Sequence, residues 1–343
     1  MVMAAPDGSS DTANMPGRGT YGALRIASGK LRLGQRARER MAMADEDAPV
    51  VTRMMMEQQQ APDTRRPLLQ QIRKELGRPV MSFFTSFHYP VMIEDDVDML
   101  EAVLQKLDLK DGLALIINSP GGDGLEAERI IQVCRSYSKT GEYWAIVPSK
   151  AKSAATMICL GASKIIMSPT SELGPIDPQL TRSDKDDAAM VRRLSVCNIV
   201  KSYDSLFQRA TRAKGRLEPF LQQLAHYNEM EIVELRSAID LSKDIAVRSL
   251  ASGMMKGQSA KQIEKRISVL LSPKQTKSHG RPIYAPEAQA CGLRVDVQDV
   301  STPLWRAIYE LYLRTDNFVS TRAYKCVESS KHAFFVSSRE ART

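Results

Sequence analysis

The sequence has few of the residues that build metal centres and disulfide frameworks. Its 343 residues include five cysteines and four histidines. The cysteine number is odd, and no two cysteines approach a Cys-x-x-Cys spacing, which argues against a zinc module and against a disulfide scaffold. The sequence therefore implies no metal and no organic cofactor, and a reducing, cytoplasmic location fits best.

Long hydrophobic runs are also missing. The longest apolar stretches are short, such as Leu113–Ile117. A helix that crosses a membrane needs about 20 apolar residues. We expect no membrane association. Apolar residues still make up 43% of the chain, which is enough to build a sizeable core.

Charge of one sign is concentrated in a single region. The net charge is +8, and residues 251–281 hold seven basic side chains against a single acidic one. Such a patch attracts anionic partners. The patch has no interleaved aromatic residues of the kind that stack on bases. We therefore interpret it as a solvated helix face and do not expect a nucleic acid partner. The basic charge of the patch keeps such a partner as an open alternative.

The chain divides into four predicted parts. Residues 1–60 resemble a disordered or weakly ordered tail, rich in Gly, Ser, Pro and Gln. An α/β core is expected over 61–194 and a helical region over 195–275. Residues 276–343 are expected to return to the same fold.

Buried strands alternate with amphipathic helices in the predicted core. The order and spacing are typical of right-handed βαβ units with a parallel sheet. The strands are expected at 79–85, 112–118, 143–148 and 164–168, and the helices at 94–108, 125–137 and 153–161. A hairpin is considered for 323–336.

Two strand-to-helix junctions have the features of a catalytic site. Gly121 and Gly122 follow one buried strand, and amides turned outward at such a turn can bind an oxyanion. Ser153 opens the helix after the next strand, followed by Ala154. A serine there is most often a simple N-cap. Both junctions lie at the carboxyl ends of neighbouring parallel strands, however, where α/β sheets bind ligands.

These stretches carry a family resemblance. The segments GRPVMSFFTSFHYPVMIEDD (77–96), SPGG (119–122), AKSAATMICLGASKIIMSPTSELGPIDPQ (151–179) and, more loosely, HGRPIYAPEAQACGL (279–293) resemble the serine dehydrogenase proteinase family. That family is related to the Clp proteolytic subunit and signal peptide peptidase A. The resemblance implies a Clp/crotonase-type fold of stacked βαβ units followed by a helical oligomerisation region.

The resemblance also implies an activity and its residues. It points to an ATP-independent serine endopeptidase that hydrolyses unfolded proteins or peptides, assembled as a ring-like homo-oligomer. The implied catalytic residues, in chain order, are Ser153, Asp177 and His279. The implied oxyanion donors are backbone amides of Gly121, Gly122 and Ala154.

Other interpretations stay open on the sequence. Signal peptide peptidase A and its relatives use a Ser–Lys dyad, for which Lys201 and Lys185 are the candidate bases. A non-catalytic oligomeric binding protein of the same fold is a second alternative, motivated by the uncertain base and the basic patch. An acyl-CoA enzyme of the crotonase type is a third, with no glutamate that stands out as its base.

Overall fold

The computed structural model describes residues 49–51, 62–87, 92–183, 191–272 and 276–337. The chain divides into two units, Met1–Glu57 and Gln58–Thr343. The tail predicted for 1–60 lies outside the described residues, apart from 49–51. The helices and strands from Pro62 onward belong to the second unit.

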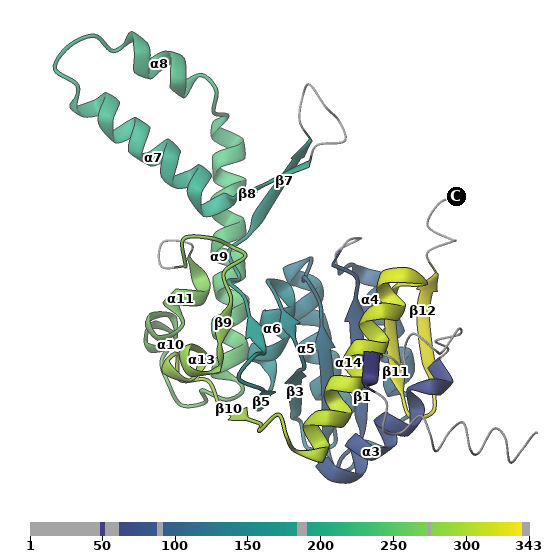
Figure 1. The fold of residues 1–343 in the computed structure, drawn as a ribbon. Helices are drawn as coiled ribbons and strands as arrows, with labels where there is room; N and C mark the ends of the chain where they lie inside the picture. The colour runs from purple at the N-terminus through teal and green to yellow at the C-terminus, as the bar shows by residue number, and fades with distance from the viewer. Residues whose placement is uncertain (1–48, 52–61, 88–91, 184–190, 273–275, 338–343) are drawn as a thin grey trace, which may run out of the picture. The chain divides into compact units, whose positions relative to one another are not determined.

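A mixed sheet forms the centre of this unit (Figure 1). In the described part of the chain its seven strands have the order β10-β5-β3-β2-β1-β11-β12. The five strands from β10 to β1 run parallel, and β11 and β12 are added antiparallel at one edge. The strand bounds are β1 Val80–Thr85, β2 Leu113–Asn118, β3 Tyr143–Val147, β5 Lys164–Met167, β10 Val295–Val297, β11 Ala323–Ser329 and β12 Ala333–Ser337.

Both faces of the sheet are covered by helices, which explains the continuous apolar strands. Along β2, Leu113, Leu115 and Ile117 join one apolar cluster, and Ala114 and Ile116 join the other. Neighbouring residues of a strand point to opposite faces, so a strand buried on both faces must be apolar throughout. The α/β class predicted from the sequence is confirmed.

Different helices cover the two faces. One face carries α4 (Glu94–Leu104), α5 (Gly124–Tyr137) and α6 (Ala154–Gly161), whose apolar residues lie in the larger cluster. The opposite face carries α3 (Arg66–Leu76), preceded by the 3-10 turn η1 (Pro62–Thr64), and α14 (Pro303–Thr321). We call the main sheet with these helices the sheet body.

Two small sheets lie beside the sheet body. One has the order β4-β6-β9, formed by β4 (Lys150–Ala151), β6 (Glu172–Leu173) and β9 (Ile283–Tyr284). The other is an antiparallel pair, β7 (Gln179–Ser183) with β8 (Val191–Ser195). The β7–β8 pair falls at the end of the predicted core, where the sequence pattern predicts no strands.

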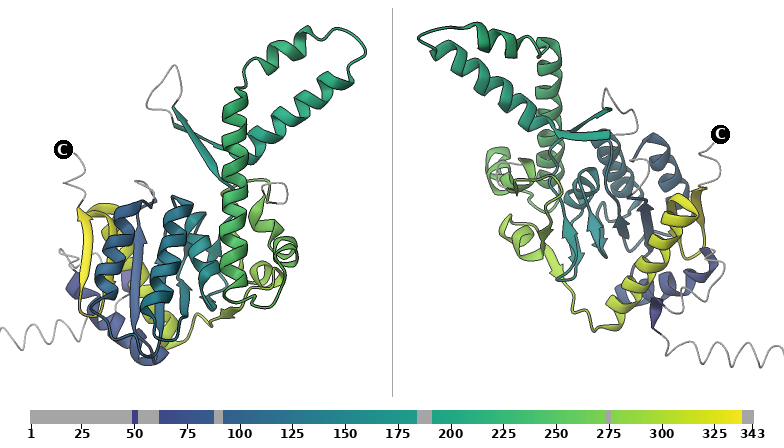
Figure 2. Two further views of the ribbon diagram at one scale, coloured as in Figure 1. Left: turned by 180° about the vertical axis from the view of Figure 1, so that it is seen from behind. Right: turned by 45° about the horizontal axis from the view of Figure 1, so that its top comes forward.

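A group of helices extends away from the sheet body, as both views in Figure 2 show. They are α7 (Val196–Arg212), α8 (Glu218–Leu224) and the first part of α9 (Glu229–Ala251). We call residues 196–239 the arm. Its small apolar cluster is separate from the two clusters of the sheet body. The second half of α9 returns to the larger cluster, together with α10 (Ala260–Arg266), α11 (Ser268–Leu271) and α13 (Ala285–Ala290).

The hairpin considered for 323–336 is confirmed as β11–β12. Ser259 and Gln262 form a capping box at the start of α10. The boundaries of the predicted parts at 194/195 and 275/276 stay predictions. No described helix has the length and apolar character needed to cross a membrane.

Candidate active site

Ser153 lies on a sharp turn between β4 and α6. Its backbone has φ 50° and ψ −122°, a conformation that residues with a side chain rarely adopt. Such a conformation costs about 1–3 kcal/mol and persists only where the surroundings impose it. The Ser153 hydroxyl makes no capping bond to α6. The simple N-cap interpretation therefore does not describe this serine.

The Gly-Gly turn after β2 packs directly against the Ser153 turn. Gly121 has φ 96°, and a Cβ at this position would lie 2.5 Å from the Lys152 carbonyl oxygen and 2.8 Å from the Ala154 nitrogen. A Cβ at Gly122 would lie 2.2 Å from the Met92 nitrogen. Only glycine fits at either position, because a methyl group would displace backbone on the opposite side.

The amides of these two turns differ in what they already bind. The Gly121 N–H donates to Ser119 Oγ at 3.1 Å, so it is used within its own turn. The amides of Gly122 and Ala154 make no hydrogen bond to other described residues. Ala154 is the first residue of α6, where an amide has no partner within the helix. Two donors therefore remain beside Ser153.

The structure brings Asp177 and His279 together from 102 positions apart. His279 Nδ1 lies 2.8 Å from Asp177 Oδ1. Because a carboxylate accepts, this contact places the proton on Nδ1 and leaves Nε2 as the basic nitrogen. The Asp177 side chain is fully buried, whereas that of His279 is 25% exposed. The arrangement is that of an acid that orients a partly accessible base.

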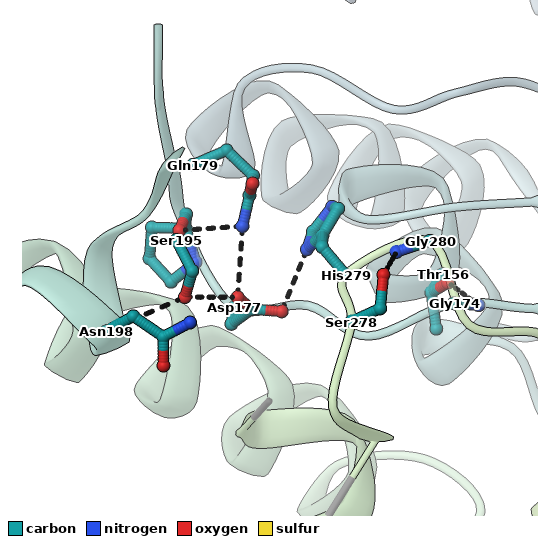
Figure 3. A network of polar contacts seen from close by, with 10 residues as sticks. Thr156, Gly174, Asp177, Gln179, Ser195, Asn198, Ser278, His279 and Gly280 are labelled. Carbon is teal, nitrogen blue, oxygen red and sulfur yellow. Dashed lines mark hydrogen bonds and ion pairs between the residues drawn. The ribbon is translucent and has the colours of Figure 1, made fainter. Parts of the chain in front are cut away.

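The second oxygen of Asp177 is also bound, by two residues that the sequence pattern does not reveal as site residues. Gln179 Nε2 and Ser195 Oγ each donate to Asp177 Oδ2 at 3.0 Å. Figure 3 shows these donors and His279 converging on the carboxylate. Gln179 stands only two residues after Asp177 in the sequence. Ser195 gives only the signal of a helix N-cap, and nothing in the sequence pairs it with a residue 18 positions earlier.

The three-stranded sheet explains how these distant residues meet. Strand β4 ends two residues before Ser153, β6 ends four residues before Asp177, and β9 begins four residues after His279. β6 pairs with both of the others. Ser119 also forms a bridge to Ala151, which attaches the Gly-Gly turn to β4. One small sheet thus aligns the segments that carry the candidate site.

Ser153 and His279 line the same cavity, of about 560 Å³. Gly122 and Ala154 also line it. Polar residues such as Asp123 and Arg193 contribute to its remaining wall, together with the apolar residues Leu125, Met157, Ile176, Leu241 and Ile245. The last two residues come from α9, so this helix takes part in the cavity wall. A larger, more open cavity in the arm, of about 900 Å³, holds none of the predicted site residues.

Of the two candidate lysine bases, Lys201 lies in the described part of the chain, and the structure does not bring it to Ser153. Lys201 is an exposed residue of α7 and does not line the cavity. Lys185 lies outside the described residues. Lys152, the neighbour of Ser153, forms an ion pair with Glu172 at 3.0 Å and donates to the Leu173 carbonyl at 3.2 Å. Burial lowers the pKa of the Lys152 ammonium, and the Glu172 carboxylate opposes that shift.

Residues 68–198 match the family model described as ClpP-like SDH-type serine proteinase. This part of the chain is similar to the ClpP-like SDH-type serine proteinases. It begins in α3, ends in the first turn of α7, and contains Ser153 and Asp177, whereas His279 lies beyond it. The α/β architecture of the chain fits the Clp-type fold of that family.

Two proteins of Methanocaldococcus jannaschii are similar to the chain, and both are named as uncharacterized. MJ0137 is 39% identical over 104 residues, which is 30% of this chain and 33% of the relative. MJ1495 is 34% identical over 106 residues, 31% of this chain and 32% of the relative. The chain therefore matches about a third of the length of each relative. The match to a family of serine proteinases supports a hydrolase activity. The names of the two relatives indicate no activity.

Proposed function

We propose that the protein is a serine endopeptidase that hydrolyses peptides or unfolded proteins without ATP, through an acyl-enzyme on Ser153. The observation that carries the proposal is the 2.8 Å contact between His279 Nδ1 and Asp177 Oδ1 at the cavity that Ser153 lines. A buried carboxylate, an oriented imidazole and a serine on a strained turn are the parts that acyl transfer requires.

In this mechanism His279 is the general base. Its Nε2 takes the hydroxyl proton as Ser153 Oγ bonds to the carbonyl carbon of the scissile peptide. The same proton then passes to the leaving amine nitrogen when the C–N bond breaks. Water repeats the sequence on the resulting ester and releases the carboxylic acid. Asp177 holds the imidazole in the tautomer that both steps need.

Backbone amides are the proposed oxyanion donors. Gly122 and Ala154 are favoured over Gly121, because the Gly121 N–H is already donated to Ser119. Preorganised donors of this kind typically contribute about 2.7–4 kcal/mol each to stabilisation of the transition state. In this proposal Gly121 has a steric role instead of donating to the oxyanion, because the absence of a side chain lets the two turns approach each other.

Assembly into a homo-oligomeric ring is part of the proposal. The arm exposes large apolar side chains that a monomer would leave in water: Leu217, Leu221, Met230 and Val233. Burial of such residues favours association. Light scattering coupled to size-exclusion chromatography tests this: a single monomeric mass at micromolar concentration would contradict it.

A labelling experiment tests the activity. The wild-type protein, Ser153→Ala, His279→Ala and Lys201→Ala are treated with a fluorophosphonate probe, and digestion of fluorescein-labelled casein is followed in parallel. His226→Ala is the matched control, because His226 is an exposed histidine of the arm. We expect labelling at Ser153, its loss in the first two variants, and no change in the Lys201 and His226 variants.

Two outcomes would overturn the proposal. An assembled wild-type protein that is neither labelled nor active supports a non-catalytic binding protein instead. A loss of labelling in Lys201→Ala with retention in His279→Ala supports the Ser–Lys mechanism.

A further inference from the structure

Ser195, the residue that precedes the arm, contacts the Asp177 carboxylate. Ser195 is the last residue of β8 and the N-cap of α7. Its hydroxyl donates to Asp177 Oδ2 at 3.0 Å and accepts from the Asn198 N–H at 3.4 Å. One oxygen therefore holds both the start of the arm and the acid of the candidate site.

Ser195 does not line the cavity that Ser153 and His279 share. Gln179, the other donor to Asp177 Oδ2, lines the site cavity, but Ser195 does not. Ser195 lines the separate cavity of the arm. An effect of Ser195 on catalysis would therefore pass through Asp177 or through the start of the arm, whereas an effect of Gln179 could also come from contact with substrate.

The geometry explains what the hydroxyl does for the carboxylate. Asp177 is fully buried, so each of its oxygens needs donors to offset the loss of water. Two donors on Oδ2 fix the rotation of the carboxylate and keep Oδ1 directed at His279. The backbone supports the same contact, since the Val196 N–H donates to the Pro178 carbonyl at 3.0 Å. The first turn of α7 is thus attached both to the acid and to the residue that follows it.

We propose that Ser195 is a positioning residue that holds Asp177 in the orientation His279 requires and makes that orientation depend on the start of the arm. The inference rests on the proposed function. Removal of the hydroxyl leaves Gln179 as the remaining donor to Oδ2 and frees the carboxylate to rotate. The acylation step is then affected, and binding in the cavity is not.

The test measures how fast the fluorophosphonate probe acylates Ser153, separated into a maximal rate constant and a half-saturating concentration. Ser195→Ala is compared with Ser195→Thr, which keeps the hydroxyl and the cap. Asn228→Ala is the matched control: Asn228 caps α9 in the same arm, through a 2.9 Å bond to the Met230 N–H, and makes no contact with Asp177. Ser195→Gly is measured as well, because glycine is tolerated at N-caps and also lacks the hydroxyl.

We expect Ser195→Ala and Ser195→Gly to lower the maximal rate about tenfold to a hundredfold, the effect of losing a hydrogen bond to a buried charge. The half-saturating concentration should stay the same. Ser195→Thr should restore the rate and Asn228→Ala should match the wild type.

An unchanged rate in Ser195→Gly, with Ser153 still labelled in the wild type, overturns the inference and leaves the proposed function standing. An equal loss in Asn228→Ala would also overturn it, because the effect would then come from loosening the arm. Absence of labelling in the wild type overturns both proposals together.

Discussion

Ile116 in the sheet body and Ile232 in the arm are isoleucines in apolar clusters, and their surroundings differ. Ile116 has no exposed surface and belongs to a cluster of sixteen buried residues among those described. Ile232 is 3% exposed, in a cluster whose described members include only four buried residues, Val196, Val200, Ile232 and Leu235. The sheet body has a deep core between two layers of helices, whereas the arm has a thin core between helices that face water on most sides.

The comparison shows where cooperative stability resides in this chain. Burial of apolar surface contributes about 25 cal/mol per Å², so a cluster of four residues contributes far less than the clusters of the sheet body. Regions with few buried apolar contacts open locally at lower free energy than the rest of a protein. The site lies between the two regions, because its cavity is lined by Ser153 from the sheet body and by α9, which extends into the arm.

The largest expected difference comes from matched core truncations. Ile116→Ala should lower the global free energy of unfolding by about 2–5 kcal/mol, through lost burial and a cavity that cannot collapse. Ile232→Ala should open the arm alone. Hydrogen exchange measured by mass spectrometry, beside denaturant unfolding, should then show lost protection over 196–239 with the strands unchanged. Equal global effects of the two variants would mean that arm and sheet body unfold as one unit.

The next effect concerns two glycines. Gly121→Ala combines a positive φ with contacts below 3 Å, and we expect a loss of about 2–4 kcal/mol from backbone strain and overpacking. At Gly215, between α7 and α8, an added methyl group would meet no atom within 4 Å. Gly215→Ala should change the free energy of unfolding by less than about 1 kcal/mol. Thermal unfolding of both variants measures the difference, and similar losses would contradict it.

Two helix caps give a smaller and more local effect. Asn228 caps α9 in the arm, and Thr302 caps α14 in the sheet body through a 3.2 Å bond from the Trp305 N–H. Each change to alanine should cost about 1 kcal/mol. Thr302→Ala should lower the global stability, whereas Asn228→Ala should appear only as faster hydrogen exchange in the arm. A global loss in Asn228→Ala would show that the two regions are coupled more strongly than their cores suggest.

The alkylation rates of Cys134 in the sheet body and Cys197 in the arm compare the two regions without a substitution. Burial raises the pKa of the Cys134 thiol in α5 to about 12. Burial, with the nearby Asp177 charge, raises the pKa of the Cys197 thiol in α7 to about 11. Because the thiolate reacts, alkylation of Cys197 should quicken about tenfold per pH unit between about pH 7 and 10. Cys134, which has no exposed surface, should react only on unfolding. Iodoacetamide labelling followed by mass spectrometry measures both rates, and equal rates at about pH 8 would contradict the expectation.

The sheet body could be predicted from the sequence because its signals are local. Continuous apolar strands, small residues at Ser153 and the paired glycines are visible within windows of a few residues. The β7–β8 pair could not be predicted, because β8 includes two consecutive arginines and alternates poorly. Strand pairing depends on a partner elsewhere in the chain, which a local pattern cannot show.

The candidate site divides in the same way. Ser153 and the Gly-Gly turn can be recognised from their own neighbourhoods. The contact between Asp177 and His279 spans 102 positions and depends on the pairing of β6 with β9, two strands of two residues each. Such short strands leave almost no signal in the sequence. The Ser195 contact depends on where α7 begins, which is itself set by the β7–β8 pair.

Helix α9 is shared by both cores and by the cavity. Its first half contributes Ile232 and Leu235 to the arm, its middle contributes Leu241 and Ile245 to the cavity wall, and its end contributes Leu250 to the larger cluster. A ligand that binds only when α9 is ordered must stabilise the ordered arm by mass action. Linkage is reciprocal. A partner that binds the ordered arm therefore increases the affinity for the ligand by the same factor by which the ligand increases the affinity for the partner. Ligand binding in the cavity and partner binding on the arm surface then both depend on the equilibrium between the ordered and the opened arm.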